Sequence, residues 1–149
     1  MKFFISYTYD DAPWAHWVGF VLMENEHEVF VHEWEIEAGG NIPEWMERRL
    51  DECDRVIAIV SDAYINNEAY SQSERLAAYW SSPSGEPFLI PVIVSPTEKI
   101  PRLISNLKRL YIHDLVENHA EEVLISFVTP PQIPPDRPRY PGRNSNETT

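Results

Sequence analysis

The sequence predicts an α/β fold of the flavodoxin-like type, a three-layer sandwich with a five-stranded parallel sheet of order 2-1-3-4-5 and helices on both faces. Two observations predict it. Short apolar segments without polar alternation, typical of strands buried on both faces, recur along the chain. Amphipathic segments with helical spacing separate them. Right-handed crossovers between such strands favour this order.

The first half of the chain contains two predicted strands and two predicted helices. The strands are KFFIS (2–6) and HEVFVH (27–32). Asp10 and Asp11, with Pro13 just inside, mark the start of the helix between them. Its apolar residues recur at helical spacing: Trp14, Trp17, Val18, Val21 and Leu22. Residues 33–43, EWEIEAGGNIP, are predicted to form a loop, after which Asn41 caps a second helix.

The second half continues the alternation. The predicted strands are RVIAIV (55–60), PFLIPVIV (87–94) and LKRLYIH (107–113), and Pro91 marks the middle one as irregular. Ser61 or Asp62 caps a helix over 62–80 that is broken near Asn66-Asn67. A closing helix is expected from Glu117 to Phe127.

Two regions follow from this layout: a folded domain over residues 1–129 and a proline-rich tail or linker over 130–149. The tail holds six of the 13 prolines and almost no aliphatic side chains. It cannot bury enough apolar surface to offset its ordering entropy. It is either a disordered end or a spacer toward a further domain.

Composition limits the classes of partner. The formal net charge is −12, from 24 acidic and 12 basic residues, which argues against nucleic acid and anionic membranes as partners. A single cysteine, Cys53, excludes an intrachain disulfide and fits a reducing cytoplasm. The chain shows neither a charged-then-apolar leader nor an apolar run near 18 residues, so we expect a cytoplasmic protein.

One carboxylate stands out as a candidate catalytic group. Glu74 follows Tyr70 by four residues, so on a helix the two side chains project from one face. A ring beside a carboxylate suits a ligand that has a stackable base and a hydroxyl-rich sugar. Ligands of open α/β sheets bind outside the carboxyl ends of the strands, near the switch point between strands 1 and 3. Ser6 and Tyr7 after strand 1, and Ser61 after strand 3, would reach that edge.

Several other chemistries find no support in the sequence. It contains no GxGxxG, GxxxxGK[ST] or GxSxG motif. The histidines lack the spacing of metal ligands, so we expect no metal site; a carboxylate–imidazole cluster of His32 with Glu33, Glu35 and Glu37 is the weak alternative. A phosphate-accepting receiver domain shares the topology, but strand 3 ends in Val60-Ser61 and no lysine follows strand 5.

The ordered motifs resemble a bacterial-type Toll/interleukin-1 receptor (TIR) domain. The segment at residues 3–41, FFISYTYDDAPWAHWVGFVLMENEHEVFVHEWEIEAGGN, is similar to the family's opening. DRVIAIVSDAY (54–64) is similar to its third strand and the following Ser-x-x-Tyr. AYSQSERLAAYW (69–80) is similar to the segment that carries the family's catalytic glutamate, and PFLIPVIV to its fourth strand. The resemblance covers residues 2 to about 128.

The resemblance implies an NAD⁺ nucleosidase, a hydrolase or cyclase that cleaves the nicotinamide–ribose bond, with NAD⁺ as substrate and no other cofactor. Glu74 matches the family's catalytic position. The positions that match its ligand contacts are Ser6, Tyr7, Trp34, Gly40, Asn41 and Tyr70. It also implies an immune-type effector, antiphage or cell-suicide, that is activated by homotypic self-association. The alternative is a non-catalytic TIR–TIR interaction and signalling module.

Overall fold

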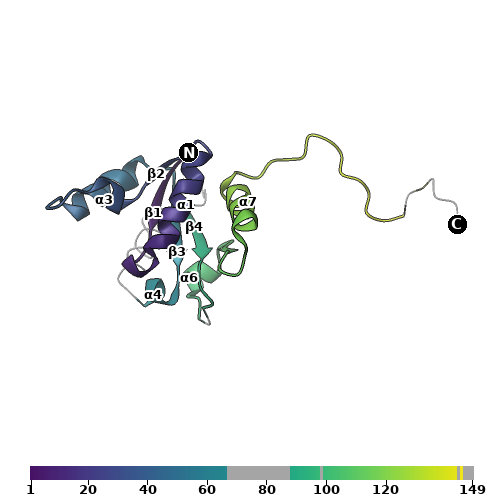
Figure 1. Ribbon diagram of the computed structural model, residues 1–149. Coiled ribbons are helices and arrows are strands. Elements are labelled where there is room, and N and C mark those ends of the chain that lie inside the picture. The colour runs from purple at the N-terminus through teal and green to yellow at the C-terminus, as the bar shows by residue number, and fades with distance from the viewer. Residues whose placement is uncertain (67–87, 98, 144, 146–149) are drawn as a thin grey trace.

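The fold is a parallel sheet flanked by helices, seen in a computed structural model that describes residues 1–66, 88–97, 99–143 and 145 (Figure 1). Its strands are β1 (Lys2–Ser6), β2 (Glu28–Phe30), β3 (Arg55–Val60), β4 (Leu89–Ile93) and β5 (Leu110–Tyr111). Its helices are η1 (Tyr9–Asp11), α1 (Ala12–Glu24), α2 (His32–Glu35), α3 (Ile42–Glu52), α4 (Asp62–Ile65), α6 (Arg102–Ser105) and α7 (Glu117–Val128).

The sheet has the predicted order, β2-β1-β3-β4-β5, and every adjacent pair is parallel. In the register of the three strands nearest the switch point, Phe4 lies between Phe30 of β2 and Val56 of β3. Ser6, the last residue of β1, pairs with Ala58. The flavodoxin-like architecture is therefore confirmed.

Alternate side chains of the central strands enter two separate cores. Phe3, Ile5, Ile57 and Ile59 pack on the face covered by α1 and α7. Residues of the other parity pack on the opposite face against side chains of α3, α4 and α6; they include Phe4, Val56, Ala58 and Val60. This period of two is the strand repeat, and burial on both faces explains why these segments lack polar alternation.

Pro91 sits in an interior strand without breaking the sheet. The carbonyl of Ile93 accepts from the N–H of Ile112, so the backbone polar groups of Ile93 point toward β5. The backbone of Pro91, two residues earlier, faces β5 as well, and the pairing with β5 begins only at Val92. Its missing N–H therefore falls where no ladder bond is required. This placement fits the short β5, which spans two residues and not the predicted 107–113.

The region after β2 differs most from the prediction. The strand ends at Phe30, and His32 begins the short helix α2 inside the segment expected to be a strand end and a loop. The turn is closed by Trp34 N–H to Val31 O (3.0 Å) and Ile36 N–H to His32 O (2.9 Å). Tertiary contacts of Glu33 and Trp34, described below, hold this turn against β1 and α1.

The proline-rich segment 130–143 contains no helix or strand, and its side chains are exposed. Figure 1 shows it running outward from the end of α7, away from the folded body. Among the described residues, no helix is long and apolar enough to cross a bilayer.

The double burial of β3 gives a stability prediction. Ile57→Ala should lower the free energy of unfolding by about 2–5 kcal/mol, because Ile57 is fully buried and its truncation leaves a cavity. Urea denaturation followed by circular dichroism measures the change. The matched control is Ile133→Ala in the tail, where the side chain is 92% exposed and the change should stay within about 0.5 kcal/mol. A loss below about 1 kcal/mol at Ile57 would contradict the double-sided packing.

Candidate functional site

The carboxyl ends of β1 and β3 form the edge at which ligands of such sheets bind. β1 ends at Ser6 and is followed by Tyr7 and Thr8, while β3 is followed by Ser61. Ser6, Thr8 and Ser61 are the buried polar residues of the described chain, and all three lie at this edge. The predicted convergence of strands 1 and 3 is therefore observed.

A hydrogen-bonded network joins the two strand ends. The hydroxyls of Ser6 and Tyr64 lie 3.0 Å apart. Asp11 Oδ2 accepts from Thr8 Oγ1 (3.0 Å) and from Ser61 Oγ. Ser61 Oγ in turn accepts from the N–H of Tyr64 and so caps α4, as predicted (3.1 Å).

Asp11 is the residue whose role in this edge the sequence did not reveal. It was expected to mark a helix start, and α1 does begin at Ala12, yet its carboxylate makes no cap hydrogen bond there. It links the loop after β1 to the loop after β3, across 50 residues of sequence. The available signal was Thr8 three residues before it, a spacing that favours a local side-chain hydrogen bond.

Tyr7 is held by its neighbours from the loop after β2. Its hydroxyl donates to Glu33 Oε1 at 2.6 Å, and its ring stacks on His32 with centroids 5.2 Å apart. Burial, together with the adjacent Glu33 carboxylate, raises the pKa of the Tyr7 hydroxyl above its usual value. His16 Nε2 of α1 lies 3.5 Å from the same carboxylate oxygen. Glu33 thus connects β1, α1 and α2.

Trp34 lies on the outer side of this connection. Its indole packs over Gly19 of α1, where a Cβ would stand 2.9 Å from Trp34 Cη2. His16 and Phe20 contact the same indole, with ring centroids 5.3 and 5.7 Å away. The side chain is still 39% exposed. Trp34 is therefore a partly exposed anchor of α2 on α1.

Gly40 and Asn41 shape the backbone between α2 and α3. Gly39 adopts φ +84°, which favours glycine, and a Cβ on Gly40 would meet Ile36 Cγ2 at 2.6 Å. Asn41 Oδ1 accepts from Glu44 N–H at 3.0 Å and caps α3, as predicted. Together they set a tight turn between α2 and α3.

Part of the acidity of this region is balanced within the chain. Arg49 pairs with Glu35 (2.5 Å) and with Glu52 (2.9 Å), and its guanidinium lies over the ring of Phe30 at 4.5 Å. Glu33 is held by Tyr7. Across the described residues, no group of three or more His, Cys, Asp or Glu side chains is arranged to hold a metal ion. The weak alternative of a metal cluster around His32 gains no support there.

Tyr70 and the candidate catalytic Glu74 lie outside the described residues, and so does most of the helix predicted over 62–80. The described helix α4 starts at the polar edge, capped by Ser61, and continues to Ile65. The chain is described again from Phe88, just before β4.

Cys53 has no features of a nucleophile. It lies half-buried at the end of α3, where its thiol donates to the carbonyl of Leu50 (3.4 Å). Burial, reinforced by the charge of Asp54, raises the pKa of the thiol to about 12.

Comparisons with known proteins agree with this fold. A sequence model of the TIR domain matches residues 3–125. The TIR domain of the Toll-related receptor TRR-2 from Hydra magnipapillata superposes with a TM-score of 0.66 and 17% identity, covering 83% of this chain and 91% of that one. A prokaryotic SEFIR domain gives 0.55 and 18%, covering 92% and 99%. The SEFIR domain of IL-17 receptor B gives 0.55 and 13%, covering 85% and 96%. At these identities the likeness shows the fold alone. No curated protein matches significantly.

The Tyr7–Glu33 hydrogen bond predicts a pH-dependent stability difference. Tyr7→Phe should lower the free energy of unfolding by about 1.5–3 kcal/mol at pH 7, since the bond is charge-assisted and buried on the tyrosine side. The folded pKa of Tyr7 is raised, so unfolded Tyr7 releases its proton first, above about pH 10. Above that pH the free energy of unfolding of the wild type falls, whereas that of Tyr7→Phe does not change for this reason. The difference in free energy of unfolding between the two proteins therefore narrows as pH rises.

Urea denaturation between pH 7 and 11 measures that gap. Tyr9→Phe is the matched control, because Tyr9 is 81% exposed and should change stability little at any pH. A difference in stability that stays constant from pH 7 to 11 would contradict a raised pKa of the Tyr7 hydroxyl.

The raised pKa of Cys53 predicts a thiol that reacts slowly. Iodoacetamide should alkylate it at pH 8 roughly 100-fold more slowly than free cysteine, because few thiolates are present. Mass spectrometry of timed samples measures the rate, and urea-unfolded protein is the control that should react at the ordinary rate. Equal rates in both states would refute a protected thiol.

Proposed function

This chain belongs to the TIR domain family, and from that membership we propose that it is an NAD⁺ nucleosidase that cleaves the bond between nicotinamide and ribose. Its product would be linear ADP-ribose, cyclic ADP-ribose or a signalling nucleotide. On this proposal NAD⁺ is the substrate and no further cofactor takes part. The protein would act in the cytoplasm as an immune-type effector, antiphage or cell-suicide, and self-association would activate it.

The observation that carries the proposal is the polar edge at the switch point. Buried Ser6 ends β1 and buried Ser61 directly follows the adjacent strand β3. Along the chain, α4 leads from Ser61 toward the segment that contains Glu74. A ligand at this edge would meet the loops after β1, β2 and β3, which is the usual position in open α/β sheets.

The proposed chemistry requires one carboxylate. Nicotinamide in NAD⁺ is a cationic leaving group, so it departs as a neutral base with the electron pair of the C–N bond, and no general acid is required. The ribose develops oxocarbenium character, as in glycoside hydrolysis. The Glu74 carboxylate would stabilise that charge, and water or an internal nucleophile of the dinucleotide then bonds to the same carbon. Tyr70 would stack on the nicotinamide and orient it.

The described residues suggest particular roles for the predicted ligand contacts. The side chains of Ser6 and Tyr7 are already hydrogen-bonded to Tyr64 and Glu33, so they would shape the floor of the site. Gly40 and Asn41 would act by fixing the loop that borders it. Trp34 keeps an exposed edge that a ligand or a neighbouring copy would contact.

A second candidate is a non-catalytic TIR–TIR interaction module. The observation that favours it is the mutual pairing of the edge groups, since Ser6, Tyr7, Asp11 and Ser61 all bond within the chain. Exposed aromatic surface at Phe20 (57%) and Trp34 (39%) would suit contact with another domain. The two functions share the fold, so a measurement of catalytic activity is needed to decide between them.

The decisive variant is Glu74→Gln. The purified chain of 149 residues, concentrated or with a crowding agent, should release nicotinamide from NAD⁺. The variant should lower kcat by about 10²–10³-fold because the charge opposite the oxocarbenium ion is lost. Chromatography with mass spectrometry measures nicotinamide and the ribosyl product.

The matched control is Glu47→Gln, which changes an exposed glutamate of α3 in the same way and should leave the rate unchanged. Circular dichroism checks that both variants are folded. Undiminished activity in Glu74→Gln would refute the assigned role. An inactive wild type at every concentration would favour the interaction module.

A further inference from the structure

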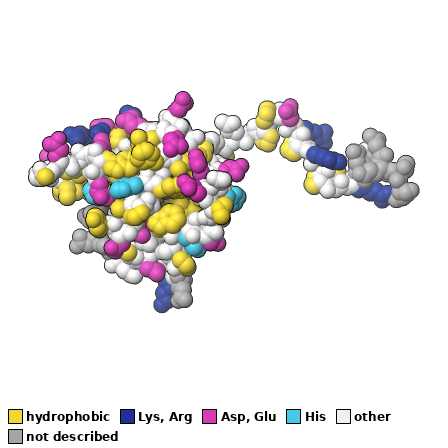
Figure 2. All heavy atoms as spheres, in the orientation of Figure 1, with side chains coloured by type: hydrophobic (Ala, Val, Ile, Leu, Met, Phe, Trp, Pro, Cys, Tyr) yellow, Lys and Arg dark blue, Asp and Glu magenta, His cyan; other side chains and the backbone are white. Residues whose placement is uncertain are grey.

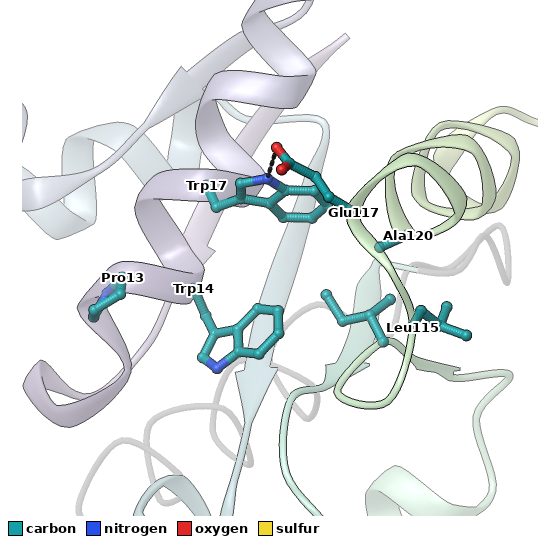
Figure 3. A pocket seen from close by; sticks show the side chains of 7 residues that line it. Pro13, Trp14, Trp17, Leu115, Glu117 and Ala120 are labelled. Carbon is teal, nitrogen blue, oxygen red and sulfur yellow. Dashed lines mark hydrogen bonds between the residues drawn. The ribbon is translucent and has the colours of Figure 1, made fainter.

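A groove between α1 and α7 is separate from the network at the ends of β1 and β3. It has a volume of about 300 Å³, near the lower end for small-ligand sites. Trp14 and Trp17 of α1 line one side, and Leu115, Glu117 and Ala120 line the other (Figure 3). The space-filling view shows hydrophobic side chains along this face, with acidic side chains beside them (Figure 2).

The polar groups of the groove are few and well placed. Trp17 Nε1 donates to Glu117 Oε1 at 3.3 Å, and this hydrogen bond joins α1 to α7 across the groove. The indole N–H of Trp14 makes no hydrogen bond to any residue that the structure describes. The groove therefore offers two indole rings, one N–H donor and one carboxylate.

We propose that this groove binds the proline-rich segment 130–141 of a second copy of the chain. Grooves lined by aromatic side chains recognise polyproline II segments, whose exposed backbone carbonyls accept from indole N–H groups. The segment carries Pro130, Pro131, Pro134, Pro135, Pro138 and Pro141. Its side chains are exposed in the structure, so they are free to dock elsewhere.

Charge favours this occupant. The whole chain has twice as many acidic as basic residues, yet segment 130–143 holds three arginines, Arg137, Arg139 and Arg143, against the single acid Asp136. Arg137 and Arg139 flank Pro138, so a docked Pro138 would bring a guanidinium toward Glu117.

The direction of the tail favours a second copy over the chain's own groove. Glu117 is at the first turn of α7, whereas the tail leaves α7 after Val128, about 16.5 Å away along the helix. To reach its own groove the tail would have to turn back along α7 soon after Val128, whereas Thr129 and Pro130 each precede a proline and are therefore held in extended conformations. The tail in fact runs outward from the body (Figure 1).

A pair of complementary charge-reversed chains tests the proposal. One carries Glu117→Arg and keeps the natural tail; the other carries Arg137→Glu and Arg139→Glu and keeps the natural groove. In each alone, groove and tail have the same sign of charge, so self-association should weaken about tenfold relative to wild type. In an equimolar mixture each tail meets an opposite groove, and association should return to near the wild-type level.

Sedimentation velocity over a concentration series measures association, and fluorine NMR of 5-fluorotryptophan protein measures the Trp14 signal, assigned with Trp14→Phe. Glu122→Arg, an exposed charge reversal on α7 away from the groove, is the matched control and should leave association unchanged. Recovery in the mixture, with a concentration-dependent Trp14 shift, supports the proposal. This readout does not involve NAD⁺ cleavage.

Three outcomes would overturn it. A wild-type chain that stays monomeric while tail reversal shifts the Trp14 signal would place the tail in its own groove. Self-association of unchanged strength in both charge-reversed chains would place the interface elsewhere. Failure of the mixture to recover, with all variants folded by circular dichroism, would exclude pairing between Glu117 and the tail arginines.

Discussion

The double-sided burial of β3 is the constraint on which the rest of the structure depends. Val56 to Val60 have no exposed surface, and their alternate side chains enter two different cores. A strand in that position has no room for a polar side chain without a partner. Polar chemistry is therefore confined to the ends of the strands, where Ser6, Thr8 and Ser61 are buried but hydrogen-bonded.

Those strand-end groups also fix the loops around the candidate site. Asp11 joins the loop after β1 to the start of α4, and Glu33 joins Tyr7 and His16 to α2. The loops are thus preorganised by side chains that have no catalytic role in the proposed reaction. If NAD⁺ binds here as proposed, it would meet a shaped rim, and Glu74 would supply a carboxylate for the reacting ribose.

The unusual charge of the chain is distributed in a way that fits self-association. Arg49 offsets two nearby acids, and Figure 2 shows further acidic side chains on the surface of the folded body. The basic exception is the proline-rich tail, which leaves the body at the end of α7. On the proposal above, a basic tail and an acidic, tryptophan-lined groove would allow copies to associate without burying a large apolar face.

The sequence by itself determined what depends on neighbours along the chain: the strand β3, the caps Asn41 and Ser61, and the fold that follows from the alternation of strands and helices. Tertiary structure alone decided the helical turn at His32, the role of Asp11 and the groove between Trp17 and Glu117. The last two depend on contacts across 50 and 100 residues. No local pattern encodes such pairs, because their members are far apart in the sequence and meet only in the folded chain.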